Sequence, residues 1–204
     1  MTIRLCLLGA GGYGREVLDC LLNDSRFEVA GFVDDSPAFR GNEVAGVPVL
    51  GGVDDVPLLP DVLFLASVGS PALRRKMTQS LLARGANFAR VLCGYIGSRS
   101  QIGASLIHPG AVLSVDCQVA DYVSISFGAV LGHDTVVGDY THIGWGAFIA
   151  GNCHIGEGVL IEPSVCIARG LHIGSGAHIG LGSVVLRDVP EGATVLGNPG
   201  RVVR

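Results

Sequence analysis

The sequence of 204 residues has few charged side chains and no cluster of positive ones. Only 16% of the residues are charged, the formal net charge is −4, and no run of lysines and arginines is longer than three residues. Proteins that bind nucleic acid present a basic stripe or patch, so no nucleic-acid partner is expected.

Long apolar segments are also missing. No apolar run reaches the roughly 18 residues that a membrane-spanning helix needs, so no membrane insertion is expected. The opening segment MTIRLCLLGAGGYG is too short, and too soon interrupted by glycines, for a signal peptide. With no export signal, we expect a cytoplasmic protein.

The cysteines lack the spacing of a metal or redox motif. None of the six forms a C-x-x-C pair. In a reducing cytoplasm they are expected to be free thiols that behave as small apolar core residues.

Glycine, in contrast, is abundant, and its 31 copies indicate a structural repeat. Every sixth residue from Ile107 to Val185 is aliphatic. The residue after each of these anchors is usually small, and the residue two before it is small or apolar. Because residues two apart on a strand share a face, both point inward around a narrow core.

Six-residue strands with a corner at each end build a triangular prism of three strands and 18 residues per coil. Ile96-Gly97 and Ile102-Gly103 lie one residue out of phase with this run and predict a first, irregular coil. The tail EGATVLGNPGRVVR leaves the period and is expected to cap the open end.

The N-terminal segment has a different pattern, typical of a βαβ unit. Apolar strands are expected at 3–8, 28–33 and 61–69, and helices at 15–24 and 71–85, while 88–92 would lead into the solenoid. Alternating strands and helices imply a parallel sheet with right-handed connections. The sequence therefore predicts an α/β domain over 1–92 followed by a β-solenoid over 93–204.

Gly9-x-Gly11-x-x-Gly14 lies between the first strand and helix, where a glycine-rich turn can hold a phosphate. Asp34 follows Gly14 by 20 residues, the position of a ribose-binding acid in a Rossmann site. A tight packing turn between strand and helix is the alternative explanation. A unit of this size suits one nucleotide better than NAD.

Four histidines precede an anchor and should point outward: His142, His154, His172 and His178. They are interpreted as solvated or subunit-contact residues. His154 and His172 are 18 residues apart and should stack, as a metal-binding pair could. The five-residue histidine spacing of the zinc-binding solenoid enzymes is absent, so no metal is expected. His108 is interpreted as structural.

His133 lies two residues after anchor Leu131, just past a corner, and faces outward next to Asp134. One coil later the same position is Gly151, which leaves the backbone bare, and His142 lies on the following face. A histidine base, a carboxylate and exposed backbone N–H groups are what acyl transfer requires.

The combination of GAGGYGREV, GFVDD and GHDTVVGDYTHIG resembles the NeuD/PglD-type sugar O-/N-acyltransferases over essentially the whole chain. The resemblance implies a Rossmann-like domain, a left-handed parallel β-helix of hexapeptide repeats, and homotrimers with active sites between neighbouring solenoids. It also implies acetyl-CoA as co-substrate, no permanently bound cofactor, and a nucleotide-linked amino sugar as acceptor.

The same resemblance assigns roles to individual residues. His133 would be the general base with Asp134 beside it, while His142 and Gly151 would contact acetyl-CoA. The nucleotide sugar would be held by seven residues: Gly11, Gly12, Tyr13, Gly14, Asp34, Asp35 and Gly69. The chain departs from the family pattern at Tyr13, where histidine is frequent, at Ser70-Pro71 and at Gly200.

The expected activity is thus N-acetylation of a nucleotide-activated amino sugar in bacterial surface-glycan synthesis. O-acetylation of a sialic acid or related sugar is the alternative within the same fold. A non-catalytic nucleotide-sugar-binding protein and a metal-dependent hydratase are further alternatives. Outward-facing Phe127, Trp145 and Phe148 are the expected subunit-contact residues.

Overall fold

A computed structural model describes residues 2–204 and divides the chain into two compact units. The first unit ends at Arg90, and the second comprises Val91–Arg204. Within the described residues, no helix is both long enough and apolar enough to cross a membrane.

The first unit is an α/β domain built on one sheet with the strand order β3-β4-β2-β1-β5. Its elements are β1 (Ile3–Leu8), α1 (Gly12–Leu22), β2 (Phe27–Val33), β3 (Glu43–Val44), β4 (Val47–Gly51), β5 (Val62–Ala66) and α2 (Pro71–Ala83). The strands β4, β2, β1 and β5 run parallel, and β3 pairs antiparallel with β4. The parallel sheet expected from the sequence is confirmed.

Two features of this unit differ from the sequence-based expectation. Helix α1 begins at Gly12, inside the glycine-rich turn, rather than at Arg15. The β3–β4 hairpin was not predicted, because its strands are short and its turn is Ala45-Gly46, whose φ angles are 51° and 77°. Alanine gives no signal for a left-handed turn position.

Helix α1 packs tightly on the sheet because Gly14 has no side chain. Val17, Leu18 and Leu21 form its buried face. A Cβ atom at Gly14 would clash with the carbonyl oxygen of Gly9, because the two atoms would be much closer than van der Waals contact. The third glycine of the motif therefore serves the packing of helix on strand.

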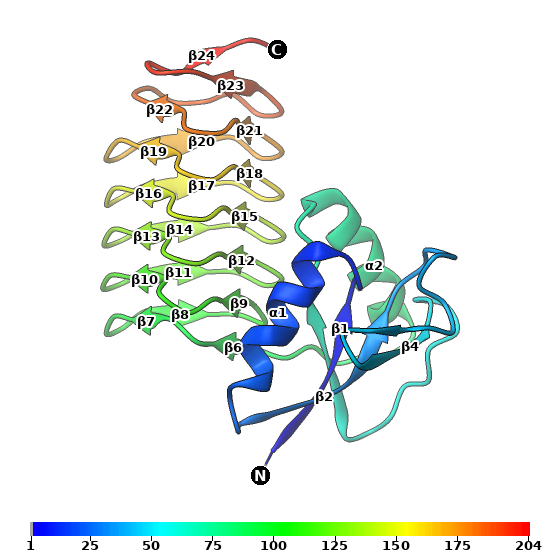
Figure 1. Cartoon of the computed structure of the whole chain (residues 1–204). Coiled ribbons are helices and arrows are strands. Elements are labelled where there is room, and N and C mark those ends of the chain that lie inside the picture. Colours follow the sequence, from blue (N-terminus) through cyan, green and yellow to red (C-terminus); the bar gives the residue numbers. More distant parts are fainter. Residues whose placement is uncertain (1) are drawn as a thin grey trace. The chain divides into compact units, whose positions relative to one another are not determined.

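The second unit is the left-handed β-helix, with three parallel sheets forming the sides of a prism (Figure 1). The β7 sheet contains β7 (Tyr95–Ile96), β10 (Val112–Leu113), β13 (Val130–Leu131), β16 (Phe148–Ile149), β19 (Cys166–Ile167) and β22 (Val184–Val185). The β8 sheet contains β8 (Gln101–Ile102), β11 (Gln118–Val119), β14 (Val136–Val137), β17 (His154–Ile155) and β20 (His172–Ile173).

The third side, the β6 sheet, includes the C-terminal cap. It contains β6 (Val91–Leu92), β9 (Leu106–Ile107), β12 (Ser124–Ile125), β15 (His142–Ile143), β18 (Leu160–Ile161), β21 (His178–Ile179), β23 (Thr194–Leu196) and β24 (Arg201–Val202). Strand β24 turns back antiparallel to β23, so the tail closes the solenoid as expected.

The prism interior is the aliphatic core that the six-residue period predicted. All fourteen anchors are at most 4% exposed. The first coil is one residue shorter than the others, since Ile96 pairs with Leu113 and Ile102 with Val119. This shortening explains why its sequence lies out of phase with the later repeats.

We expect Gly14→Ala to destabilise the first unit by about 2 kcal/mol, because the new methyl group overpacks the helix–strand contact. For a domain of this size that corresponds to a melting temperature lower by about 10 °C. Gly11→Ala is the matched control, since a Cβ there meets nothing within 4 Å. Equal melting temperatures for the two variants, measured by calorimetry, would contradict this account of the packing.

Candidate active site

The residues expected to bind a nucleotide gather around one cavity of about 410 Å³ in the first unit. The cavity lies at the carboxyl ends of β1, β2 and β5, where ligands bind in open α/β sheets. All seven predicted residues line it: Gly11, Gly12, Tyr13, Gly14, Asp34, Asp35 and Gly69.

One wall of this cavity is the N-terminus of α1, which is suited to an anion. Gly11 is the N-cap residue, and the first turn of the helix contains no acidic side chain. A Cβ at Gly11 would meet nothing within 4 Å. The backbone N–H groups of a helix's first turn, the helix dipole and the open space together make this turn a candidate phosphate site.

The two aspartates after β2 also organise the walls of the cavity. Asp34 accepts hydrogen bonds from the backbone N–H groups of Ala10 and Ser36, both at 2.8 Å. Asp35 accepts one from the N–H of Val53 at 2.9 Å. Asp34 therefore ties the glycine-rich turn to the end of β2, a structural task that the ribose-binding prediction did not include.

The apolar side of the cavity was not predicted from the sequence. Phe39, Val68, Leu73 and Met77 line it, together with Ser36 and Ser67. Leu73 and Met77 lie one turn apart on α2, as their spacing in the predicted helix could have suggested. Phe39 gave no such signal, because it lies in the segment between β2 and β3.

A buried arginine supports the turn after β5. Arg74 is fully buried in α2, and its guanidinium donates to the carbonyl oxygen of Val68. Burial lowers the pKa of Arg74 to about 10. Val68 and Gly69 are thereby fixed at the cavity wall.

His133 and Asp134 form a hydrogen-bonded pair at the corner between β13 and β14. The Nδ1 atom of His133 lies 2.6 Å from Oδ2 of Asp134. With a proton on Nδ1 donated to the carboxylate, Nε2 carries the lone pair that a general base needs. The His133 side chain is 44% exposed, so a ligand can reach it.

The structure brings Gly151 against His133, but in a different way from that expected. A Cβ at Gly151 would lie 2.7–2.9 Å from ring atoms of His133. The imidazole itself thus lies against the backbone of Gly151 that was expected to be bare. A side chain at this position would displace the ring of His133.

His142 is not brought to His133 within one copy of the chain. It is half-buried on β15 in the β6 sheet, and strand β14 separates the two residues along the chain. The two histidines therefore belong to different sides of the prism.

The remaining histidines agree with their interpretation from the sequence. His154 and His172 stack with ring centroids 4.8 Å apart, and His178 contacts Glu162 at 3.2 Å. His108 is fully buried against Phe127, and burial lowers its pKa to about 4. Among residues 2–204, no group of three or more metal-ligating side chains is suitably placed for an ion.

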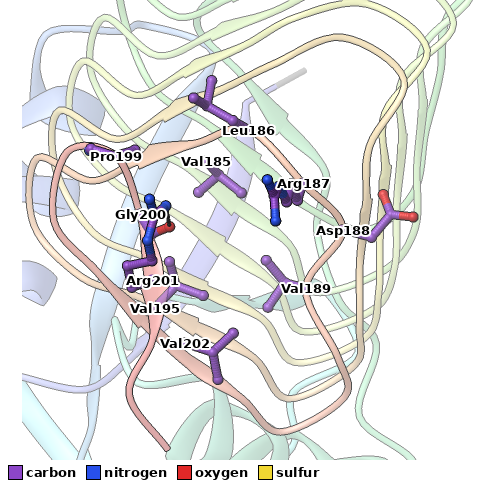
Figure 2. A pocket seen from close by; sticks show the side chains of 10 residues that line it. All are labelled: Val185, Leu186, Arg187, Asp188, Val189, Val195, Pro199, Gly200, Arg201 and Val202. Carbon is purple, nitrogen blue, oxygen red and sulfur yellow. Dashed lines mark hydrogen bonds between the residues drawn. The ribbon is translucent and has the colours of Figure 1, made fainter.

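A second cavity, of about 420 Å³, lies at the C-terminal end of the solenoid. Figure 2 shows Arg187 and Arg201 in it, together with four valines: Val185, Val189, Val195 and Val202. The strands β13, β16, β19 and β22 pair in register. His133, Gly151, Arg169 and Arg187 therefore follow one another along a single edge that leads to this cavity.

Comparisons with known proteins agree with this geometry. Residues 4–81 match the PglD N-terminal domain family. No curated protein sequence matches the chain.

The chain is similar to several solved structures over nearly its full length. The acetyltransferase domain of PglB from Neisseria gonorrhoeae, solved with acetyl coenzyme A, has a TM-score of 0.89 and 28% identity over 100% of both chains. PerB from Caulobacter crescentus, solved with CoA and GDP-perosamine, has a TM-score of 0.88 and 25% identity over 98% of this chain and 97% of that one. WeeI from Acinetobacter baumannii has a TM-score of 0.77 and 26% identity over 99% of this chain and 100% of that one.

The glycine-rich cavity, the His-Asp corner and these full-length similarities agree with one another. Residues 4–81 thus resemble the PglD N-terminal domain family, and the chain over its full length is similar in structure to the acetyltransferase domain of PglB and to PerB.

Proposed function

We propose that this protein transfers the acetyl group of acetyl-CoA to the amino group of a nucleotide-activated amino sugar. The observation that carries the proposal is the His133–Asp134 pair on the exposed corner of a β-helix. The ligands of PglB and PerB, acetyl-CoA in one and CoA with GDP-perosamine in the other, support it. The product would serve bacterial surface-glycan synthesis in the cytoplasm.

The chemistry is direct attack of the amine on the thioester. As the C–N bond forms, Nε2 of His133 accepts a proton from the amine. The C–S bond then breaks, and the proton on His133 can pass to the departing CoA thiolate. Asp134 keeps the imidazole in the tautomer that leaves Nε2 free and stabilises the imidazolium that forms. No covalent acyl-enzyme is needed.

Acetyl-CoA is proposed to lie along the edge that begins at His133. Neighbouring parallel strands are about 4.8 Å apart, so the three coils from His133 to Arg187 span about 14 Å. That length suits the pantetheine arm, which joins the thiol to the phosphates of CoA. Arg169, Arg187 and Arg201 supply the positive charge that the phosphates need.

The nucleotide is proposed to occupy the cavity of the first unit. Its phosphates would lie on the open N-terminus of α1, near Gly11 and Gly12. Its base would contact the apolar wall of Phe39 and Leu73.

We further propose a homotrimer in which a second copy covers the β7 sheet. The outward residues of this sheet are all apolar or aromatic: Tyr95, Val112, Val130, Phe148, Cys166 and Val184. Phe148 is 49% exposed, and the neighbouring corner adds Trp145 in edge-to-face contact with Phe127. An apolar face of this extent is typical of a subunit interface. An intersubunit site would also let His142 of one copy act with His133 of another.

We expect His133→Ala to lower the rate of acetyl transfer by about 10²–10⁴-fold, the usual contribution of a general base. Asp134→Asn should lower it less, because the imidazole is kept but loses its charged partner. CoA thiol release measures both effects. His172→Ala, an exposed histidine on the β8 sheet, is the matched control, and wild-type activity in His133→Ala would rule out this base.

The acceptor is identified by thiol release from acetyl-CoA over UDP-, dTDP- and GDP-linked amino sugars, with CMP-sialic acid alongside. We expect one amino sugar to support release and to yield an alkali-stable amide. An ester that is lost in mild alkali would assign the enzyme to O-acetylation instead. Binding of nucleotide sugars without any thiol release would favour a non-catalytic role.

We expect Phe148→Arg to convert the trimer to monomers, because three charges would be buried in apolar interfaces. Light scattering gives the mass directly. Leu22→Arg replaces an exposed leucine at the end of α1 and should leave the mass unchanged. A wild-type protein that is monomeric at assay concentrations would contradict the proposed assembly.

A further inference from the structure

A second carboxylate, that of Asp116, lies one coil before the corner that carries His133 and Asp134. The backbone N–H of Asp134 donates to the carbonyl oxygen of Val115 at 3.1 Å, which places Asp116 one coil before Asp134. Both aspartates have left-handed backbones, with φ angles of 59° and 58°. Two negative charges therefore lie about one strand spacing apart along this edge.

Arg99 neutralises the first of these carboxylates through a two-pronged ion pair. Its Nε and Nη2 atoms lie 2.7 Å and 2.5 Å from the two carboxylate oxygens of Asp116. This hydrogen-bonded guanidinium holds the pKa of Asp116 below its usual range. The paired geometry is the most directional form of an arginine–carboxylate contact.

The ion pair also interacts electrostatically with the catalytic pair. Asp116 interacts with the His133 ring, and Arg99 interacts with Asp134. Without Arg99, the charge of Asp116 would favour a protonated His133 and would repel Asp134. With Arg99 in place, Asp134 is left as the carboxylate partner of the imidazole.

We propose that Arg99 and Asp116 are positioning residues that control the protonation of His133 and thereby the pH range in which it can act as a base. The effect of this ion pair on His133 follows from the geometry of the corner, and only the role of His133 as a base rests on the proposed function.

The other ionisable groups near this corner are the same in the wild type and in the variants. From the following coils the edge presents Arg169, whose guanidinium lies 3.1 Å from the side-chain amide of Asn152 when the amide oxygen faces it. On the coil of Asp116, burial raises the pKa of the inward-facing Cys117 thiol, so that group carries no charge. Both should affect His133 equally in the wild type and in the variants.

The test is an NMR titration of the His133 imidazole, assigned by its absence in His133→Ala. Removing the cation in Arg99→Met should move the titration midpoint up by about 0.5 in pH, and Asp116→Asn should move it down by a similar amount. The double variant should return close to the wild type, because both charges are removed together.

Arg26→Met is the matched control. Arg26 makes the same kind of exposed two-pronged pair with Asp24, on a turn that shares no coil with His133. This variant removes the same charge from the chain and should leave the His133 midpoint in place. Thermal unfolding of each variant verifies that the fold is retained.

Opposite shifts for the two single variants support the proposal, because damage to the structure alone would not reverse direction between them. Shifts in the same direction, or shifts no larger than that of the control, overturn it. The titration needs no acceptor sugar, so its result is separate from that of the proposed function. In an active enzyme, the acid limb of the kcat/KM profile should move in parallel.

Discussion

The functional edge of this protein depends on the in-register stacking of short parallel strands around an aliphatic core. Each coil hydrogen-bonds to the next through the same pairs of positions, such as Leu131 with Ile149 and Ile149 with Ile167. Inward-facing aliphatic side chains hold the register, because a slip by one residue would turn them out into water. Any position relative to an anchor is therefore repeated in space at a fixed interval.

Because of this register, residues that are 18 apart in the sequence lie one above another along one edge of the solenoid. His133, Gly151, Arg169 and Arg187 are each two residues past an anchor, and so they follow one another along one edge. The same rule makes neighbouring positions interdependent, since a side chain at position 151 would meet the ring of His133. The conformation of His133 thus depends on the residue at the same position in the next coil.

The first unit uses its glycines for two different purposes. Gly14 allows α1 to approach the strand, whereas Gly11 leaves open space at the helix N-terminus. Asp34 links the two purposes, because its carboxylate fixes the glycine-rich turn through the N–H of Ala10. The cavity is therefore shaped by the same contacts that hold the helix on the sheet. The two units divide the work in the proposed reaction, with recognition of the nucleotide in one and acyl transfer in the other.

The sequence by itself determined the solenoid, its coil length, the parallel sheet, and the His133–Asp134 pair, because all of these depend on periodicity, on the order of elements or on neighbouring residues in the chain. It could not determine contacts between side chains that are distant in the chain. The apolar cavity wall at Phe39, the ion pair between Arg99 and Asp116, and the packing of His133 on Gly151 became visible only in three dimensions. The physical reason is that periodicity fixes the face on which a side chain lies, whereas the choice of contact on that face depends on rotamers and on how neighbouring segments fill the remaining space.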